Sequence, residues 1–506
     1  MKVKMILPAL TEARSPYFRP IKYSLFPPLG LATLAGYLEP DDEIELWDEH
    51  VQDVPLDDRP ELVVIEAYVT SARRAYALAD HHRRRGAHVC LGGLHPTALP
   101  DEARAHADTV FCGPGEDTWP AFLRDFRAGR PGACYQSTAR SLVDAPPPRR
   151  DLLASTRYLV PSSIVVSRGC PHHCAFCYKD SFYRGGRSFY TQRVDAALAE
   201  IARLPGRHLF FLDDNLFADR RFALALFAGM RGMGRVWQAA ATVGGALDRE
   251  LLDAARASGL RSLFVGFETL RAPGLLAARK GHNLVGSYQA VTDALHERGI
   301  MVNGSFVFGM AEDDESVFDR TVDWAIARGI ETATFHILTP YPGTDLHRQL
   351  RAMGRLLHED WDRYDTRHAV FRPERMTPAA LERGYWHAYR RFYQLDNIAR
   401  AAASKPGALA MLRHLAYTIG WKKLEPFWAF VIHSGLLGTM RPVLETLLEL
   451  DPRQRRAVSA SQAWANAEGP REPASPALRL ASMEPSLTAL GERGSVGRRA
   501  PLGAAA

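Results

Sequence analysis

Long apolar runs and cysteines are scarce in this sequence. The 506 residues contain no stretch of 18 consecutive apolar residues, so we expect no helix that crosses a membrane. A secretory signal is not expected either, because charged residues follow at once after the short apolar core near the start. Six cysteines do not make a disulfide framework in a chain of this length. Three stand alone and three crowd into eight residues, which favours the reducing cytoplasm and a metal site.

Basic residues only slightly outnumber acidic ones. The net charge is +6, and the tail at 451–506 supplies +3 of it through eight arginines and five acidic residues. The remaining +3 is too little for a nucleic-acid-binding protein, whose basic residues gather on one face. Hydrophobic residues at 46% and charged residues at 24% are ordinary for globular proteins and exclude a wholly disordered chain. The length predicts about three domains.

The N-terminal third alternates short apolar runs with helical patterns. Strands are predicted at 3–8, 44–47, 62–65, 88–91 and 109–111, with helices at 29–38 and 73–85. This alternation with short connections predicts parallel βαβ units, and hence an α/β, doubly wound (Rossmann-like) domain. Such sheets bind ligands at the carboxyl ends of their strands, and two loops there are rich in glycine, which lets the backbone approach a ligand. Their glycines are Gly92, Gly93, Gly113 and Gly115.

A second alternation follows a proline-rich linker. Strands are predicted at 163–166, 208–212, 236–242, 262–267, 302–308 and 332–338, with helices between them. At least six βα units predict a partial or complete TIM-like barrel. The pattern then becomes purely helical, and the last fifty residues carry no sustained period and are expected to be disordered. The predicted domains are 1–143, 161–375 and 376–450, with a linker at 144–160 and a tail at 451–506.

The sharpest chemical signal is the run CPHHCAFC, which follows the predicted strand at 163–166. Its cysteines, Cys170, Cys174 and Cys177, are the ligand type that holds iron–sulfur clusters. Three ligands leave one iron of a 4Fe–4S cluster open, and an open iron can bind a reactant. The alternatives are a zinc site with His172 or His173 as the fourth ligand, or three unrelated core cysteines.

This spacing resembles the radical SAM superfamily, with Arg168 and Gly169 before the first cysteine and aromatic residues around the third. The resemblance implies that the open iron chelates S-adenosylmethionine (SAM). It also implies that electron transfer from a low-potential donor, such as flavodoxin or ferredoxin, cleaves SAM to a 5′-deoxyadenosyl radical. The residues it implies at the SAM site are Phe176, Asp213, Asp214 and Glu268. For Asp213 and Asp214, a helix cap is the alternative role.

The N-terminal motifs refine the resemblance. The runs PPLGL at 27–31, WDE at 47–49, GGLHPT at 92–97 and GPGE at 113–116, ahead of such a core, resemble the cobalamin-binding radical SAM subfamily over residues 1–375. The resemblance implies that the two glycine-rich loops contact cobalamin. Many cobalamin domains carry DxHxxG, whose histidine coordinates cobalt, but the run DEHVQD at 48–53 lacks the glycine. We therefore expect cobalamin to bind base-off without a protein imidazole, and His50 and His95 to be loop histidines.

The resemblance implies a methyltransferase that acts on an unactivated carbon of a small-molecule or lipid-like substrate. One SAM would methylate cobalamin, and a second would give the radical that removes hydrogen from the substrate. The alternatives are oxidative cyclisation or ring contraction, a radical SAM enzyme with a degenerate cobalamin domain, and a binding protein with a structural cluster. The sequence assigns no further catalytic residue.

The apolar segment at 421–440 also has two possible roles. We expect a buried accessory helix, and the alternative is an interfacial patch with weak peripheral membrane contact through Lys422 and Lys423. Aromatic residues that could line a substrate cavity are Tyr341, Trp361, Tyr364 and Trp386.

Overall fold

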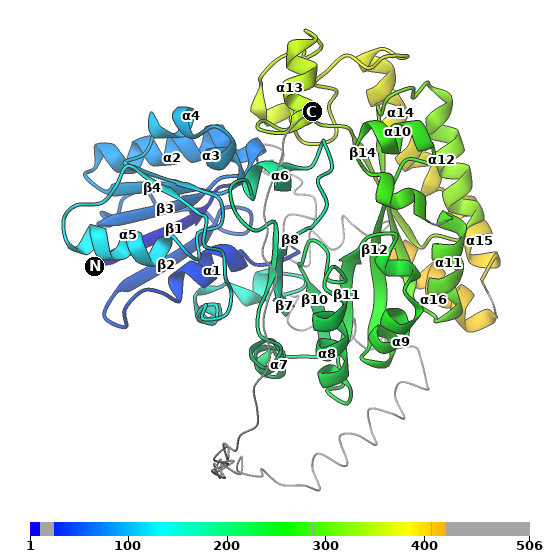
Figure 1. Ribbon diagram of the computed structural model, residues 1–506, viewed down its shortest axis with the longest axis horizontal. Helices are drawn as coiled ribbons and strands as arrows, with labels where there is room; N and C mark the ends of the chain where they lie inside the picture. Colours follow the sequence, from blue (N-terminus) through cyan, green and yellow to red (C-terminus); the bar gives the residue numbers. More distant parts are fainter. Residues whose placement is uncertain (11–24, 286, 406, 421–506) are drawn as a thin grey trace, which may run out of the picture. The chain divides into compact units, whose positions relative to one another are not determined.

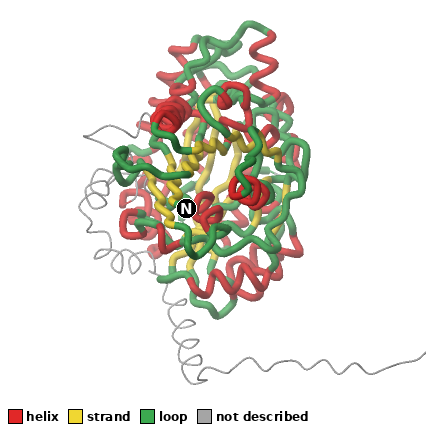
Figure 2. Tube along the Cα trace, turned by 90° about the vertical axis from the view of Figure 1, so that its left-hand side faces the viewer, coloured by secondary structure: helices red, strands yellow, loops and turns green. Residues whose placement is uncertain are grey.

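Two parallel sheets and a set of helices form the part of the chain that the computed structural model describes, residues 1–10, 25–285, 287–405 and 407–420 (Figure 1). The strands lie inside, with helices and loops around them (Figure 2). The segment at 421–440, the rest of the helical pattern up to 450 and the predicted tail at 451–506 lie outside the described residues.

The first sheet confirms the doubly wound prediction. Its order is β2-β1-β3-β4-β5-β6, and every neighbouring pair is parallel. The strands are β1 (Lys2–Leu7), β2 (Glu43–Asp48), β3 (Leu62–Glu66), β4 (His88–Gly92), β5 (Thr109–Cys112) and β6 (Cys134–Gln136). Helices α1 (Leu29–Ala35) and α5 (Trp119–Arg127) cover one face, and α2 (Ala72–Arg84) covers the other. Burial on both faces explains why the central strands β3, β4 and β5 are nearly continuous apolar runs, whereas β2 at the edge alternates apolar and polar residues.

The second sheet confirms the predicted partial barrel. It is open and parallel, in the order β14-β13-β12-β11-β10-β7. The strands are β7 (Ser163–Ile164), β10 (His208–Phe211), β11 (Val236–Ala241), β12 (Leu260–Glu268), β13 (Met301–Phe308) and β14 (Thr332–Ile337). The helices between them are α7 (Val194–Arg203), α8 (Arg220–Met230), α9 (Arg249–Ala257), α10 (Ala272–Ala277), α11 (Tyr288–Glu297) and α12 (Ser316–Ala327).

One predicted strand is shorter than expected. The strand predicted at 163–166 is paired only over Ser163–Ile164, and the chain then enters a separate antiparallel pair, β8 (Ser167–Gly169) with β9 (Phe189–Thr191). The cysteine run therefore follows β8 and lies in the connection between the two strands of this pair, rather than directly after a barrel strand. A three-residue strand has too few side chains to show a periodic pattern.

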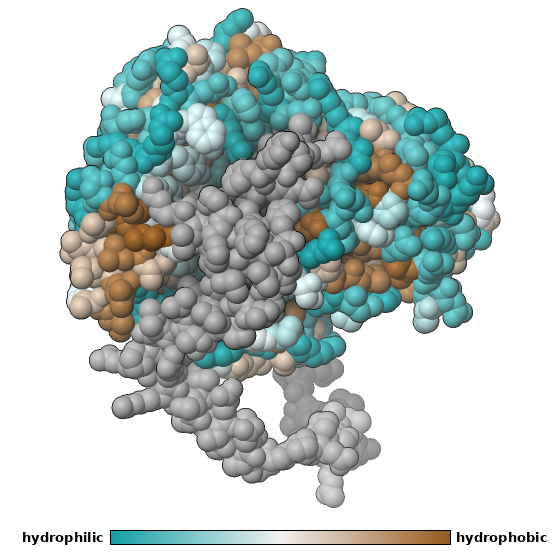
Figure 3. Space-filling view, turned by 180° about the vertical axis from the view of Figure 1, so that it is seen from behind, coloured by the Kyte–Doolittle hydropathy of each residue, from teal (hydrophilic) through white to brown (hydrophobic). Residues whose placement is uncertain are grey.

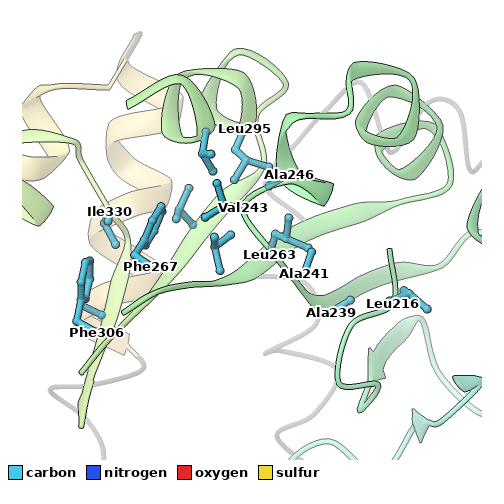
Figure 4. Packing of buried hydrophobic residues seen from close by; sticks show 14 of the residues in the cluster. Leu216, Ala239, Ala241, Val243, Ala246, Leu263, Phe267, Leu295, Phe306 and Ile330 are labelled. Atoms are coloured by element: carbon cyan, nitrogen blue, oxygen red, sulfur yellow. The ribbon is translucent and has the colours of Figure 1, made fainter. Parts of the chain in front are cut away.

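The core of the second sheet is one cluster of buried side chains. It joins strand residues such as Leu263 and Phe306 to helix residues such as Leu295 (Figure 4). The rings of Phe267 and Phe306 stack across β12 and β13 with centroids 5.6 Å apart. This packing fixes the strands whose carboxyl ends carry the candidate site.

Helix α14 (Pro378–Phe392) covers the open edge of the second sheet at β14. The backbone amide and carbonyl of Ala333 both bond the Tyr393 hydroxyl, at 3.0 and 2.8 Å. The Phe335 amide donates to the Tyr389 hydroxyl at 3.1 Å. An uncovered edge strand would present unpaired backbone groups, so these tyrosines complete the pairing of β14.

A buried ion network holds the later helices, α15 (Leu395–Ala403) and α16 (Ala408–Thr418), against the barrel. The Lys405 ammonium lies 2.5 Å from Oε1 of Glu331 and 2.8 Å from Nε2 of His296. The Thr418 hydroxyl donates to the Glu331 carbonyl at 2.8 Å. Burial is the largest effect and opposes ionisation of Glu331, but Lys405, His296 and His414 together outweigh it and lower the pKa of Glu331 to about 2.

The described surface carries separate apolar patches on a mostly hydrophilic face (Figure 3). Its exposed large apolar side chains include four from the last two helices, Leu395, Leu409, Met411 and Leu412. Among the described residues, no helix combines the length and apolar character needed to cross a bilayer.

The Lys405 network predicts a measurable stability effect. Lys405→Met leaves the buried Glu331 carboxylate without its cation, so we expect the free energy of unfolding to fall by about 3 kcal/mol. The difference in unfolding free energy between the variant and the wild type should become smaller as the pH falls from 4.5 toward 2, because Glu331 is then protonated. Arg400→Met is the control, because its ion pair with Asp396 is solvent-exposed, and it should cost under about 1 kcal/mol. Chemical denaturation measures both, and equal effects would contradict the prediction.

Candidate active site

The cysteine loop begins where β8 meets β9. Gly169 has a φ of +79°, and a Cβ there would lie 2.0 Å from the carbonyl oxygen of Ser188, so only glycine fits. The amide of Cys170 donates to that same oxygen at 2.9 Å. Further along, the Cys177 amide donates to the Cys174 carbonyl at 3.0 Å. The tight hairpin therefore sets the start of the loop, and a turn holds the second and third cysteines together.

Two lysines lie near the candidate cluster ligands. Cys174 is buried, whereas Cys170 and Cys177 are partly exposed. Burial raises the pKa of Cys174 to about 12, and Lys280 acts in the opposite direction. Burial also raises the pKa of Cys177, and Lys179 opposes that change. Cluster binding requires thiolates, so three thiols from one loop with two cations nearby fit a 4Fe–4S cluster.

The two histidines of the loop have other partners. Nδ1 of His173 lies 2.8 Å from the carboxylate of Asp180, and the ring of His172 stacks on His282 with centroids 3.7 Å apart. No three His, Cys, Asp or Glu side chains of the described residues are arranged to hold a single metal ion. A 4Fe–4S cluster does not need such convergence, because each thiolate ligates a different iron.

Asp213 and Asp214, just after β10, have different surroundings. Asp213 is buried and accepts hydrogen bonds from the Val166 amide, at 3.2 Å, and from both the amide and hydroxyl of Ser167. Burial raises the pKa of Asp213 to about 7, against these hydrogen bonds. It ties β10 to the segment that enters the cysteine hairpin, and its acceptor positions face that backbone.

Asp214 lies beside the cysteine loop. Its carboxylate lies 2.8 Å from the ammonium of Lys179 and accepts from the Gly169 amide at 3.1 Å. The alternative role as a helix cap is not observed for either aspartate, because α8 (Arg220–Met230) is capped by Asp219. Of the two, Asp214 is better placed to meet a ligand at the cluster.

Glu268 stands at the carboxyl end of β12 in an unusual backbone conformation. Its φ is +65°, and the register with β13 shifts between Gly266 and Glu268. The buried carboxylate is ion-paired with Lys280. A strained residue beside a strand irregularity is typical of a binding site. Phe176, the other residue predicted there, packs against the barrel core.

The four predicted glycines line one cavity at the carboxyl end of the first sheet. Its volume is about 120 Å³. The other lining residues are mostly apolar and come from α1, β3, β5 and α5, and from Phe182 and Tyr183 beyond the cysteine loop, with Glu66, Glu116 and Arg168 as the charged groups. A Cβ on Gly93 would lie 2.8 Å from the Ala67 carbonyl oxygen, and one on Gly115 would lie 3.2 Å from Leu34. The cavity fits a flat aromatic group such as the nucleotide base of cobalamin.

Two arginines join the cysteine hairpin to the first sheet. Arg168, two residues before Cys170, lies 2.7 Å from the carboxylate of Glu116 in the glycine-rich loop. Arg140, which is buried, bonds several backbone carbonyls just after the cysteine loop. These carbonyls belong to Tyr183, Arg184 and Arg187. The cluster loop and the glycine-rich loops are therefore neighbours.

The histidines of the first sheet are engaged within the protein. Nδ1 of His50 lies 2.7 Å from Asp48, and Nε2 accepts from the Leu10 amide at 3.3 Å. His95 is buried in the short helix α3 (Leu94–Ala98), rather than in a loop as expected, and Nε2 lies 3.0 Å from Glu102. That neither imidazole coordinates cobalt stays a prediction.

Three of the four aromatic residues proposed to line a substrate cavity come together. Trp361 and Tyr364 are buried in a small cluster with Val69 and Val370, and Tyr341 packs against it, whereas Trp386 is 47% exposed on α14. Sequence analysis also gave no role to Lys179, Lys280, Arg140 and Glu66. Lys280 carries no local signal, because only the fold brings it to the cysteines, whereas Lys179 lies two residues after Cys177 in the sequence. Glu66 carried such a signal, since it directly follows the strand predicted at 62–65, where parallel sheets bind ligands.

Comparisons with known proteins match both parts of the chain. A radical SAM superfamily model matches residues 164–346, and a B12 binding domain model matches residues 23–123. The bacteriochlorophyllide d C-12(1)-methyltransferase of Chlorobaculum tepidum is 30% identical over 394 residues, which cover 75% of this chain and 85% of that enzyme. The hopanoid C-2 methylase of Rhodopseudomonas palustris is 26% identical over 489 residues, covering 88% and 90%.

A solved structure shares the fold. The radical SAM methyltransferase TsrM of Kitasatospora setae aligns with a TM-score of 0.59 at 15% identity, covering 79% of this chain and 90% of that one. The fold and the cysteine loop define a radical SAM enzyme with a cobalamin-binding domain. The chain belongs to the cobalamin-dependent radical SAM methyltransferases. This membership confirms the predicted reaction class and the three predicted cofactors, which are a 4Fe–4S cluster, SAM and cobalamin.

The cysteine assignment has a direct test. Anaerobic reconstitution should give about four irons per chain, and Cys170→Ala, Cys174→Ala or Cys177→Ala should each abolish most of that content and the brown absorbance. Cys90→Ala and Cys134→Ala are the controls and should keep the cluster, because these cysteines lie in the first sheet. Full iron content in the Cys174→Ala variant would refute the assignment.

Proposed function

We propose that this methyltransferase acts on a tetrapyrrole, at an unactivated carbon of a side chain. The support comes from the bacteriochlorophyllide d methyltransferase, which is 30% identical over 394 residues. The hopanoid methylase, with its polycyclic lipid substrate, is 26% identical. Both relatives bear the names of apolar polycyclic substrates, so a small polar metabolite is the less favoured class.

One structural observation carries the use of two cofactors on one substrate. The Arg168–Glu116 ion pair joins the cysteine hairpin to the glycine-rich loop, so groups held by the two loops lie at one site. When bound, the cluster supplies the electron that cleaves SAM, and cobalamin carries the methyl group. A general base cannot remove hydrogen from a carbon that has no acidic proton, so cofactors carry out this chemistry.

We propose the following roles for the chain's own residues. The three cysteines hold the cluster, and Asp214 and Glu268 face SAM, each held in place by a lysine. Asp213 acts by positioning the hairpin, since its hydrogen bonds are made to the backbone at Val166 and Ser167. The loops packed around the site exclude water from the radical.

We further propose a cytoplasmic enzyme that receives electrons from flavodoxin or ferredoxin. Support comes from the free thiols of the described cysteines, which are typical of a reducing compartment. Weak membrane contact through the exposed leucines of α15 and α16 would suit an apolar substrate.

The substrate proposal is tested with the reconstituted holoenzyme, methyl-labelled SAM and a low-potential reductant. Bacteriochlorophyllide d and a pentacyclic hopanoid are supplied in parallel. We expect label in the tetrapyrrole alone, with S-adenosylhomocysteine and 5′-deoxyadenosine rising together, because one SAM supplies the methyl group and another the radical. Label in the hopanoid alone would overturn the tetrapyrrole assignment. If 5′-deoxyadenosine rises but neither the tetrapyrrole nor the hopanoid carries label, methyl transfer to these substrates is contradicted.

A further inference from the structure

The cavity at the carboxyl end of the first sheet contains a carboxyl group that the function above does not use. Glu66 is the last residue of β3 and lines the cavity with the four glycines. A Cβ on Gly30 of α1 would lie 3.2 Å from Oε2 of Glu66, and one on Gly93 would lie 3.3 Å from its Cγ. The glycines therefore leave room for this carboxyl group at the wall of an otherwise mostly apolar cavity.

The surroundings of Glu66 favour the neutral acid. Burial raises its pKa, and the cation that opposes this shift is Arg168. Arg168 is already ion-paired with Glu116 at 2.7 Å, so an ionised Glu66 would leave the cavity with an uncompensated negative charge. The Tyr68 phenol hydrogen-bonds the Glu66 carboxyl. With the phenol donating to one oxygen, the neutral acid can donate its own proton into the cavity.

The shape and lining of the cavity indicate what accepts that proton. Phe111, Trp119, Phe182 and Tyr183 contribute aromatic rings to the lining, and the glycines contribute backbone without side chains. A volume of about 120 Å³ suits one small aromatic ring system. In cobalamin that group is the lower base, a benzimidazole whose ring nitrogen either coordinates cobalt or, in the base-off form, needs another partner. A buried acceptor without a hydrogen bond is costly.

We propose that Glu66 selects cobalamin by its lower base, donating a hydrogen bond from the cavity wall to the ring nitrogen of the benzimidazole. Glu66 is a specificity residue in this role, because corrinoids whose lower base lacks such a nitrogen cannot accept the bond. The inference depends on cobalamin binding and not on the identity of the methylated substrate.

Binding measurements on the full-length protein with its cluster test the role of Glu66. Affinity is measured by quenching of protein fluorescence for three corrinoids. These are cobalamin, a cobamide with a phenolic lower base, and cobinamide, which has no lower base. We expect Glu66→Ala to weaken cobalamin binding by about 10- to 100-fold and to leave the other two unchanged. Glu66→Gln should retain most of the affinity, because its amide can still donate.

The matched control is Glu61→Ala, at the opposite end of the same strand. Glu61 is exposed and accepts from the Lys2 amide at 2.9 Å, so cobalamin affinity should not change. Unfolding temperature and iron content verify that each variant is folded. Equal weakening of all three corrinoids by Glu66→Ala would overturn the proposal, since Glu66 would then act on the corrin or on the fold. Unchanged cobalamin affinity in the folded Glu66→Ala variant would overturn it as well.

Discussion

The contact between Arg168 and Glu116 joins the two halves of this enzyme's site. Arg168 belongs to the hairpin that carries the cysteines, and Glu116 to a glycine-rich loop of the first sheet. The ion pair is largely shielded from solvent, where removing one partner is strongly destabilising. Arg140 strengthens the same junction through backbone carbonyls beyond the cysteine loop. The positions of both cofactor loops depend on this junction.

Each sheet contributes its carboxyl edge to the junction for the same physical reason. Parallel strands direct their following loops to one edge, where ligands bind without disturbing the packed faces. In the first sheet these loops contain glycine, so backbone rather than side chains borders the cavity. In the second sheet they carry charged residues in strained or tightly bonded positions, such as Glu268 and Asp213. One edge is therefore shaped for a bulky ligand and the other for polar groups.

Much of the fold could be predicted from the sequence, because buried parallel strands and amphipathic helices have clear periods. The cysteine spacing likewise predicts the cluster loop from the sequence alone, since the three cysteines lie within eight residues. The hairpin of β8 and β9 escaped prediction because strands of three residues show no period. The role of Lys280 could not be predicted, because its ion pair with Glu268 depends on how the chain folds back after β12. The helix cap considered for Asp213 and Asp214 is not observed, because α8 begins later, at Arg220, with Asp219 as its N-cap.

The central claim is that the cluster loop and the cobalamin loops form one site. It is tested most directly by electron paramagnetic resonance of the full chain with a reduced cluster and bound Co(II) cobalamin. Two paramagnetic centres at one site interact, so we predict that the cobalt signal relaxes faster in the wild type than in the cluster-free Cys174→Ala variant. Identical relaxation of the cobalt signal in both proteins would contradict the account.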